Sequence, residues 1–190
     1  MKNAIILHGK PGKDEYYNDK YPSASNSHWL PWLQKQLLIK DIAAYTPEVP
    51  YAYAPRYEIW CKEFERYDIT AETILVGHSC GGGFIVRWLG DHPKVNVGKV
   101  VLVAPFAPSV KANWDQYGFF DFTIDSDLTR QTNGITIFGS DNDSPGIIES
   151  VQKYREVIKA VTYKEFKGYG HFTLKRMGTA EFPELLEEIL

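Results

Sequence analysis

The sequence predicts an α/β fold in which a mainly parallel, doubly wound sheet carries helices on both faces. Short apolar runs alternate along the chain with segments whose apolar residues recur at helical spacing, a pattern typical of repeated βα units. Strands that are apolar along their whole length are those of parallel sheets buried on both sides. The chain has 190 residues, of which 44% are hydrophobic, and we expect residues 1–190 to form a single domain.

The amino-terminal part alternates strand and helix twice. The apolar run at 4–7 predicts the first strand, and a polar, tyrosine-rich loop follows it as far as Ser27. Apolar residues at 29–38 fall at helical spacing, and Ser27 can cap the start of that helix. The run at 42–45 predicts a second strand, and 59–67 again has helical spacing.

The same alternation continues to the end of the chain. Glycine-rich sequence separates a strand at 73–76 from a helix at 84–89, so the glycines are predicted to form a strand-to-helix turn. The remaining predicted elements are strands at 100–103, 135–138 and 161–166, and helices at 147–158 and 182–190.

One segment interrupts the alternation. Residues 107–131 are polar and aromatic together, and they predict either a small cap or an excursion before the next strand. The candidates for lining an acyl pocket are the aromatic residues of this segment, Trp114, Phe119, Phe120 and Phe122. No larger cap is evident, so we expect a minimal cap or none.

Composition excludes several classes of protein. A net charge of −3 without a basic cluster is unlike a nucleic-acid-binding surface, so no nucleic-acid partner is expected. Two cysteines are too few for a disulfide framework. No apolar run reaches the ~18 residues of a membrane span, and the amino terminus resembles a first strand more than a signal peptide. We therefore expect a cytoplasmic protein without a membrane partner.

The stretch Gly77-His78-Ser79-Cys80-Gly81 matches the G-x-S-x-G nucleophile elbow. In that motif a sharp strand-to-helix turn lifts the serine hydroxyl clear of the sheet. Three fixed positions of common residues arise by chance in about one chain in ~15 of this length, so the motif alone decides little.

The order of polar residues at later strand ends strengthens this interpretation. Asp141 and Asp143 follow the strand at 135–138, and His171 follows the strand at 161–166. Ligands of parallel sheets bind beyond the carboxyl ends of the strands, and Ser, Asp, His is the chain order of an α/β-hydrolase triad.

The sequence resembles a family of small α/β-hydrolases of the YdeN type, which includes the vertebrate retinoblastoma-binding serine hydrolase. The resemblance covers most of the chain, and its motifs are LHG at 7–9, SHWLPWL at 27–33, GHSCG at 77–81, FGS at 138–140 and GHF at 170–172. It implies that Ser79 is the nucleophile, His171 the base and Asp143 the acid. Counting back from Pro145 favours Asp141 as the acid instead, so both aspartates stay candidates.

Two backbone N–H groups are candidates for the oxyanion hole. Cys80 directly follows the serine, and its amide is expected to matter more than its thiol. Lys10 is placed by the resemblance of HGKPG at 8–12 to the H-G-x-P-G stretch of other α/β-hydrolases. His78 is expected to support the elbow structurally.

These features predict a serine hydrolase that acts on a small ester, thioester or amide, with no cofactor and no metal. The alternative is a hydrolase fold that serves as a protein-interaction module, for which a protein partner is possible. A nucleotide- or flavin-binding domain is disfavoured because neither G-x-G-x-x-G nor a P-loop follows the first strand.

Overall fold

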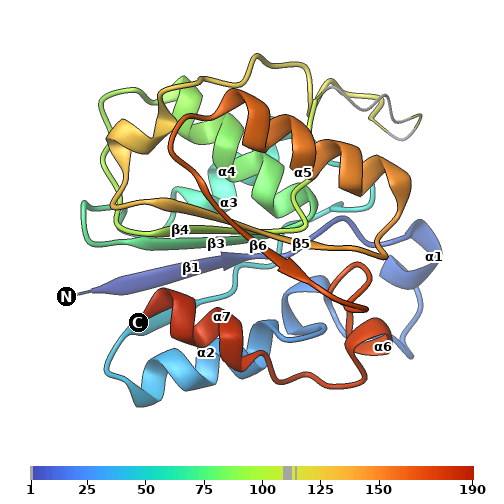
Figure 1. Cartoon of the computed structure of the whole chain (residues 1–190). Coiled ribbons are helices and arrows are strands. Elements are labelled where there is room, and N and C mark those ends of the chain that lie inside the picture. The colour runs from blue at the N-terminus through green and yellow to red at the C-terminus, as the bar shows by residue number, and fades with distance from the viewer. Residues whose placement is uncertain (1, 109–112, 114) are drawn as a thin grey trace.

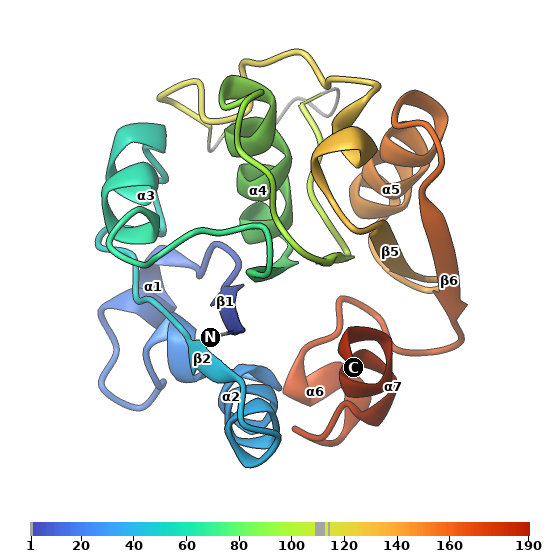
Figure 2. The same cartoon turned by 90° about the vertical axis from the view of Figure 1, so that its left-hand side faces the viewer.

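The computed structural model describes residues 2–108, 113 and 115–190. Within them, parallel strands form one open sheet in the order β2-β1-β3-β4-β5-β6 (Figures 1 and 2). The strands are β1 (Asn3–Leu7), β2 (Ala43–Tyr45), β3 (Ile74–His78), β4 (Val100–Val103), β5 (Ile135–Ser140) and β6 (Thr162–Phe166). The predicted parallel sheet is therefore confirmed.

Helices cover both faces of the sheet. Figure 2 shows α3, α4 and α5 on one face and α2, α6 and α7 on the other. The bounds are α1 (Lys13–Tyr16), α2 (Leu30–Ile39), α3 (Tyr57–Phe64), α4 (Cys80–Asp91), α5 (Pro145–Val157), α6 (Leu174–Met177) and α7 (Pro183–Ile189). Short 3-10 turns occur at Ala24–Asn26 and Leu128–Gln131.

The core lies along the middle strands. Every residue of β1, β3, β4 and β5 is buried, because helices pack on both faces of these strands. Each fully buried Val, Leu or Ile side chain contributes about 1.5–3 kcal/mol, so these runs are a main source of stability. The two edge strands differ: β2 has one buried residue, Ala44, and β6, which reads TYKEF, has none.

The strand order places a topological switch point between β1 and β3. The chain passes from β1 outward to β2 and then returns to place β3 on the other side of β1. The loops after β1 and β3 therefore leave in opposite directions, which is where ligands of open parallel sheets bind. Those loops carry Lys10 and Ser79.

The carboxyl-terminal helix α7 is tied to the sheet by a buried carboxylate. The Glu188 side chain is 8% exposed, accepts a hydrogen bond from Thr136 Oγ1, and forms ion pairs with Lys99 and Lys164. Burial alone would raise the pKa of Glu188, but the hydrogen bonds from Lys164, Lys99 and Thr136 outweigh it and lower the pKa to about 2.

The described residues 118–120, between β4 and β5, contact α4. Phe119 and Phe120 are buried, and they pack against core aromatic rings that include Phe84 and Phe106. Phe122 is half-buried, and Trp114 lies outside the described residues. That these aromatic side chains line an acyl pocket stays a prediction.

Candidate active site

Ser79 lies in a strained turn between β3 and α4. Its φ is 51° and its ψ is −116°, a conformation that costs a non-glycine residue about 1–3 kcal/mol. Its N–H donates to Val103 O at 2.9 Å, and its carbonyl accepts from Gly83 and Phe106 N–H at 3.2 and 3.1 Å. These bonds hold the serine in the conformation that the nucleophile elbow requires.

Glycines allow three chain segments to meet at this turn. A Cβ on Gly77 would lie 2.6 Å from Gly82 Cα, and one on Gly81 would lie 2.5 Å from His8 O. Side chains at these positions would push β1, β3 and α4 apart. The prediction that these glycines form a turn before the helix was wrong in one respect, because residues 81–83 lie in the first turn of α4. Close packing outweighs the poor helix propensity of glycine there: Gly81 packs against the end of β1, and Gly82 and Gly83 pack against Pro105 and Phe120.

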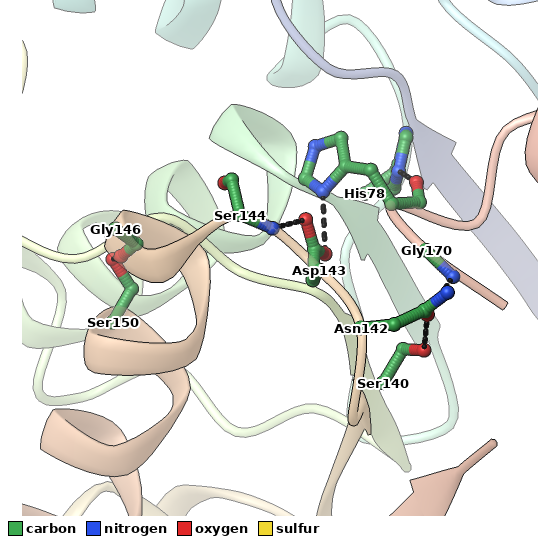
Figure 3. A network of polar contacts seen from close by, with 9 residues as sticks. His78, Ser140, Asn142, Asp143, Ser144, Gly146, Ser150 and Gly170 are labelled. Carbon is green, nitrogen blue, oxygen red and sulfur yellow. Dashed lines mark hydrogen bonds and ion pairs between the residues drawn. The ribbon is translucent and has the colours of Figure 1, made fainter. Parts of the chain in front are cut away.

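Asp143 contacts His171 directly. Asp143 Oδ2 lies 2.8 Å from His171 Nδ1, and the aspartate side chain is 3% exposed. Its other oxygen accepts the Ser144 N–H at 2.6 Å (Figure 3). A carboxylate accepts and does not donate, so His171 Nδ1 carries the proton and Nε2 is left as the acceptor in the neutral ring.

Asp141 makes a different contact. Its Oδ1 accepts the Gly168 N–H at 2.8 Å, and the residue is exposed. Of the two aspartates that the sequence offered, Asp143 is the one bonded to the imidazole of His171.

Asn142 joins the loop after β5 to the loop after β6. Its Oδ1 accepts the Gly170 N–H at 2.7 Å and the Ser140 hydroxyl at 2.9 Å (Figure 3). Gly170 directly precedes His171, so this bond fixes the backbone that carries the imidazole. Asn142 was not singled out from the sequence, and the only signal for it was its place between Asp141 and Asp143.

His78 contacts His171 through both its hydrogen bond and its ring. Its Nε2 lies 2.9 Å from the His171 carbonyl oxygen and must donate to it, and the two rings lie 4.9 Å apart between centroids. Burial, with the nearby His171 and His28, lowers the pKa of His78 well below its usual value, so this ring is neutral. Among the described residues, no hydrogen bond joins the Ser79 hydroxyl to His171; such bonds often form only with substrate bound.

The loop after β1 passes close to the serine. A Cβ on Gly9 would lie 3.0 Å from Ser79 Cβ, so only glycine fits without displacement. His8 fixes this loop: its Nε2 accepts the Val49 N–H at 3.1 Å, which leaves Nδ1 to donate to Gly9 O at 2.7 Å. Since the Gly9–Lys10 peptide is planar and trans, the same bond orients the Lys10 N–H.

The Cys80 thiol is buried and protonated at neutral pH. Burial raises the pKa of Cys80 to about 12, although interactions with the Lys10 backbone and the Ser79 hydroxyl oppose the rise. A thiol in this state is a poor nucleophile, whereas the hydroxyl of Ser79 lies at the apex of the elbow.

A cavity of about 430 Å³ adjoins His171 and Asp143. It is lined by Asn142, Asp143, Ser144, Ile147, His171 and Arg176, together with Gly170. Another hollow, of about 310 Å³, lies among the starts of β1 and β2 and the segment before β3, and its lining contains no nucleophile paired with a base. Of these two, only the first cavity is lined by the hydrogen-bonded pair His171 and Asp143.

Other kinds of site find little support in the part of the chain that the structure describes. There, no group of three His, Cys, Asp or Glu side chains is arranged to hold a metal ion. No helix among those residues is long and apolar enough to cross a membrane.

A family model and a known protein match this sequence. A family model described as serine hydrolase matches residues 19–189. The hydrolase YdeN of Bacillus subtilis (strain 168) is 35% identical over 113 residues, which cover 57% of this chain and 53% of that protein. The alignment thus spans about half the length of this relative.

Solved structures match over nearly the whole chain. The ydeN gene product of B. subtilis has a TM-score of 0.80 at 23% identity, and the match covers 100% of this chain and 97% of that chain. A YdeN-like hydrolase of Pectobacterium atrosepticum has a TM-score of 0.65 at 15% identity, with 98% and 88% covered. The monoacylglycerol lipase of Paleococcus ferrophilus has 0.61 at 13%, with 98% and 93% covered. These likenesses confirm the predicted α/β-hydrolase-type fold, here with an open sheet.

Proposed function

The chain belongs to the serine hydrolase family, and from that premise we propose that it cleaves a small ester, thioester or amide through Ser79, His171 and Asp143. The observation that carries the proposal is the 2.8 Å contact between Asp143 Oδ2 and His171 Nδ1, together with a serine held at a φ of 51° in the turn after β3. A buried carboxylate, an imidazole and an elbow serine are the three parts of a hydrolytic triad.

The first step is attack of Ser79 Oγ on the substrate carbonyl carbon. A hydroxyl is a weak nucleophile while protonated, so His171 Nε2 takes its proton as the bond forms. Asp143 keeps the other proton on Nδ1 and stabilises the imidazolium that results. The 3% exposure of the Asp143 side chain supports this role, because little water screens the charge.

The negative oxygen that develops on the substrate needs donors already in place. The Cys80 N–H, at the start of α4, and the Lys10 N–H, at the turn after β1, are the two donors in this proposal. The His8 bond to Gly9 O holds the second peptide in one orientation, so little reorganisation is required during the reaction. Removing one oxyanion donor costs ~10²–10³-fold in other hydrolases.

The cycle closes in two further transfers. His171 gives its proton to the leaving oxygen, sulfur or nitrogen as the acyl bond breaks, which leaves the acyl group on Ser79. A water then attacks the acyl carbon while His171 takes a proton from it, and that proton returns to Ser79 Oγ when the acid is released. All atoms and charges are accounted for without a cofactor.

The test compares Ser79→Ala with Cys80→Ser. We expect Ser79→Ala to lower turnover of 4-nitrophenyl acetate by about a thousandfold or more and to abolish labelling by a fluorophosphonate probe. Cys80→Ser should keep the label, because the Cys80 thiol is protonated. Circular dichroism checks that both variants fold.

Two outcomes would overturn the proposal. Labelling of Ser79→Ala at the wild-type rate would mean that another residue reacts. A folded wild-type protein that neither takes the probe nor hydrolyses a panel of acyl substrates would favour the alternative of a protein-interaction module.

A further inference from the structure

The cavity beside the triad contains one positively charged side chain that the catalytic scheme does not use. Arg176, on α6, lines the cavity of about 430 Å³ together with His171 and Asp143. Within the described residues, its guanidinium takes part in no hydrogen bond or ion pair. Arg176 is exposed at the edge of this cavity, and an arginine whose five donors are free is suited to a planar or tetrahedral anion.

The arginine is held in place by its stem. Gly170 has a φ of 54°, and a Cβ there would lie 2.8 Å from Arg176 Cγ. The aliphatic part of Arg176 therefore rests on the backbone next to His171. Helix α6 is itself anchored, since the Leu174 N–H donates to His28 Nδ1 at 3.3 Å.

Asp143 is the acidic residue among those that line the cavity, and its carboxylate is already hydrogen-bonded. Both oxygens of Asp143 are hydrogen-bonded, one to His171 and one to the Ser144 N–H, and its side chain is 3% exposed. Asp143 forms no ion pair with Arg176 among the described contacts. A ligand anion at Arg176 would thus meet an unneutralised cation, while the carboxylate of the triad is covered.

We propose that this cavity binds the leaving-group part of the substrate and that Arg176 selects leaving groups which carry a carboxylate or a phosphate. This rests on the proposed function. Ser79 is not among the residues that line the cavity; the cavity meets the reaction centre at His171. In the first half of the reaction the acyl carbon–oxygen bond breaks, the acyl carbon bonds to Ser79 Oγ, and His171 moves the serine proton to the leaving oxygen. The leaving group is therefore the part of the substrate next to this cavity.

The test uses two esters that differ only in charge on the leaving group. 4-Acetoxybenzoate releases an anionic phenol, and 4-acetoxybenzamide releases a neutral phenol of nearly the same shape. Arg176→Gln keeps the first carbons of the stem that pack on Gly170 and removes the charge. We expect it to lower kcat/KM for 4-acetoxybenzoate by about fivefold at low ionic strength and to leave 4-acetoxybenzamide within about twofold.

Lys175→Gln is the matched control, because Lys175 is the neighbouring cation on α6 and does not line the cavity. It should leave both esters within about twofold. Comparing each variant with wild type on the same ester cancels the intrinsic reactivities of the esters. 4-Acetoxyphenyl phosphate extends the series, and the anion with the larger loss in Arg176→Gln identifies whether carboxylate or phosphate is preferred.

The proposal is overturned if Arg176→Gln changes both esters equally, if it changes neither, or if Lys175→Gln has the same effect. If neither ester is hydrolysed but Ser79 still reacts with a fluorophosphonate, protection of that labelling by 4-hydroxybenzoate and by 4-hydroxybenzamide is compared instead. Equal protection then overturns the proposal, and stronger protection by the anion that is lost in Arg176→Gln supports it. Failure of the proposed function is distinct, because Ser79 would then not label at all and both proposals would fall.

Discussion

Replacing Asp143 by Asn changes one oxygen of the proposed triad into an NH₂ group with nearly the same shape. The two carboxylate oxygens have separate partners: one accepts the Ser144 N–H at 2.6 Å and the other accepts from His171 Nδ1 at 2.8 Å. An amide has one oxygen, and the Ser144 N–H requires it. The NH₂ group then faces His171 Nδ1, which must lose its proton in order to accept.

The result is an imidazole in the wrong tautomer. With Nδ1 unprotonated, the proton moves to Nε2, where the ring must accept the proton of Ser79. With the Asp143 side chain 3% exposed, water cannot easily replace the lost acceptor. We therefore expect kcat to fall about ten-thousandfold, as when the same exchange is made in a serine protease triad. This fall corresponds to a loss of about 5 kcal/mol of transition-state stabilisation.

Asp141→Asn is the control for this change. The Asn oxygen can still accept the Gly168 N–H that Asp141 Oδ1 accepts at 2.8 Å, and the residue is exposed, so activity should stay within about threefold. Both variants are assayed for kcat and KM on 4-nitrophenyl acetate, with thermal unfolding to check stability. Loss of activity in Asp141→Asn with Asp143→Asn active would refute the assignment of the acid.

Two predictions concern stability. Gly81→Ala should destabilise the protein by about 2–3 kcal/mol or more, because the new Cβ would lie 2.5 Å from the backbone oxygen of His8, directly after β1. Gly90→Ala in the same helix, where the nearest neighbour of the new Cβ is at 4.0 Å, should stabilise the protein by about 0.5–1 kcal/mol. Equal Tm shifts for the two variants would contradict this packing. The folded-state pKa of Glu188 is lowered to about 2. The contribution of this carboxylate to the free energy of unfolding is therefore complete above its unfolded-state pKa of ~4.3 and is lost as pH falls toward 2. The Tm difference between wild type and Glu188→Gln should therefore shrink over that range, and a constant difference would show that the ion pairs to α7 contribute nothing.

The sheet was predictable because its strands are local sequence signals. Runs such as residues 4–7 and 100–103 are apolar without interruption, and each of the predicted strands has a counterpart in the sheet. The two short helices α1 and α6 were not predicted. Each has four residues, none of them buried, so no apolar periodicity marks them.

The site was predictable in its order but less so in its contacts. The sequence placed Ser79, an aspartate and His171 at successive strand ends, because the carboxyl ends of parallel strands meet at one edge. It could not decide between the two aspartates, since the answer depends on how the loop after β5 turns. The sequence also could not predict the cavity or the place of Arg176 in it, because α6 reaches the site only through tertiary contacts, such as the hydrogen bond from its backbone to His28.

The three consecutive side chains at 141–143 each accept a hydrogen bond from the loop after β6. In order, they accept hydrogen bonds from the Gly168 N–H, the Gly170 N–H and the His171 Nδ1–H. Asn142, the middle residue, must supply an oxygen but no charge, and its amide does so. A carboxylate at this position would add a further negative charge near the His171 imidazolium of the proposed mechanism and change its electrostatic environment. Asp141 and Asn142 therefore align the loops after β5 and β6 through the Gly168 and Gly170 N–H groups, and Asp143 is left to accept the Nδ1–H of His171, as the proposed triad requires.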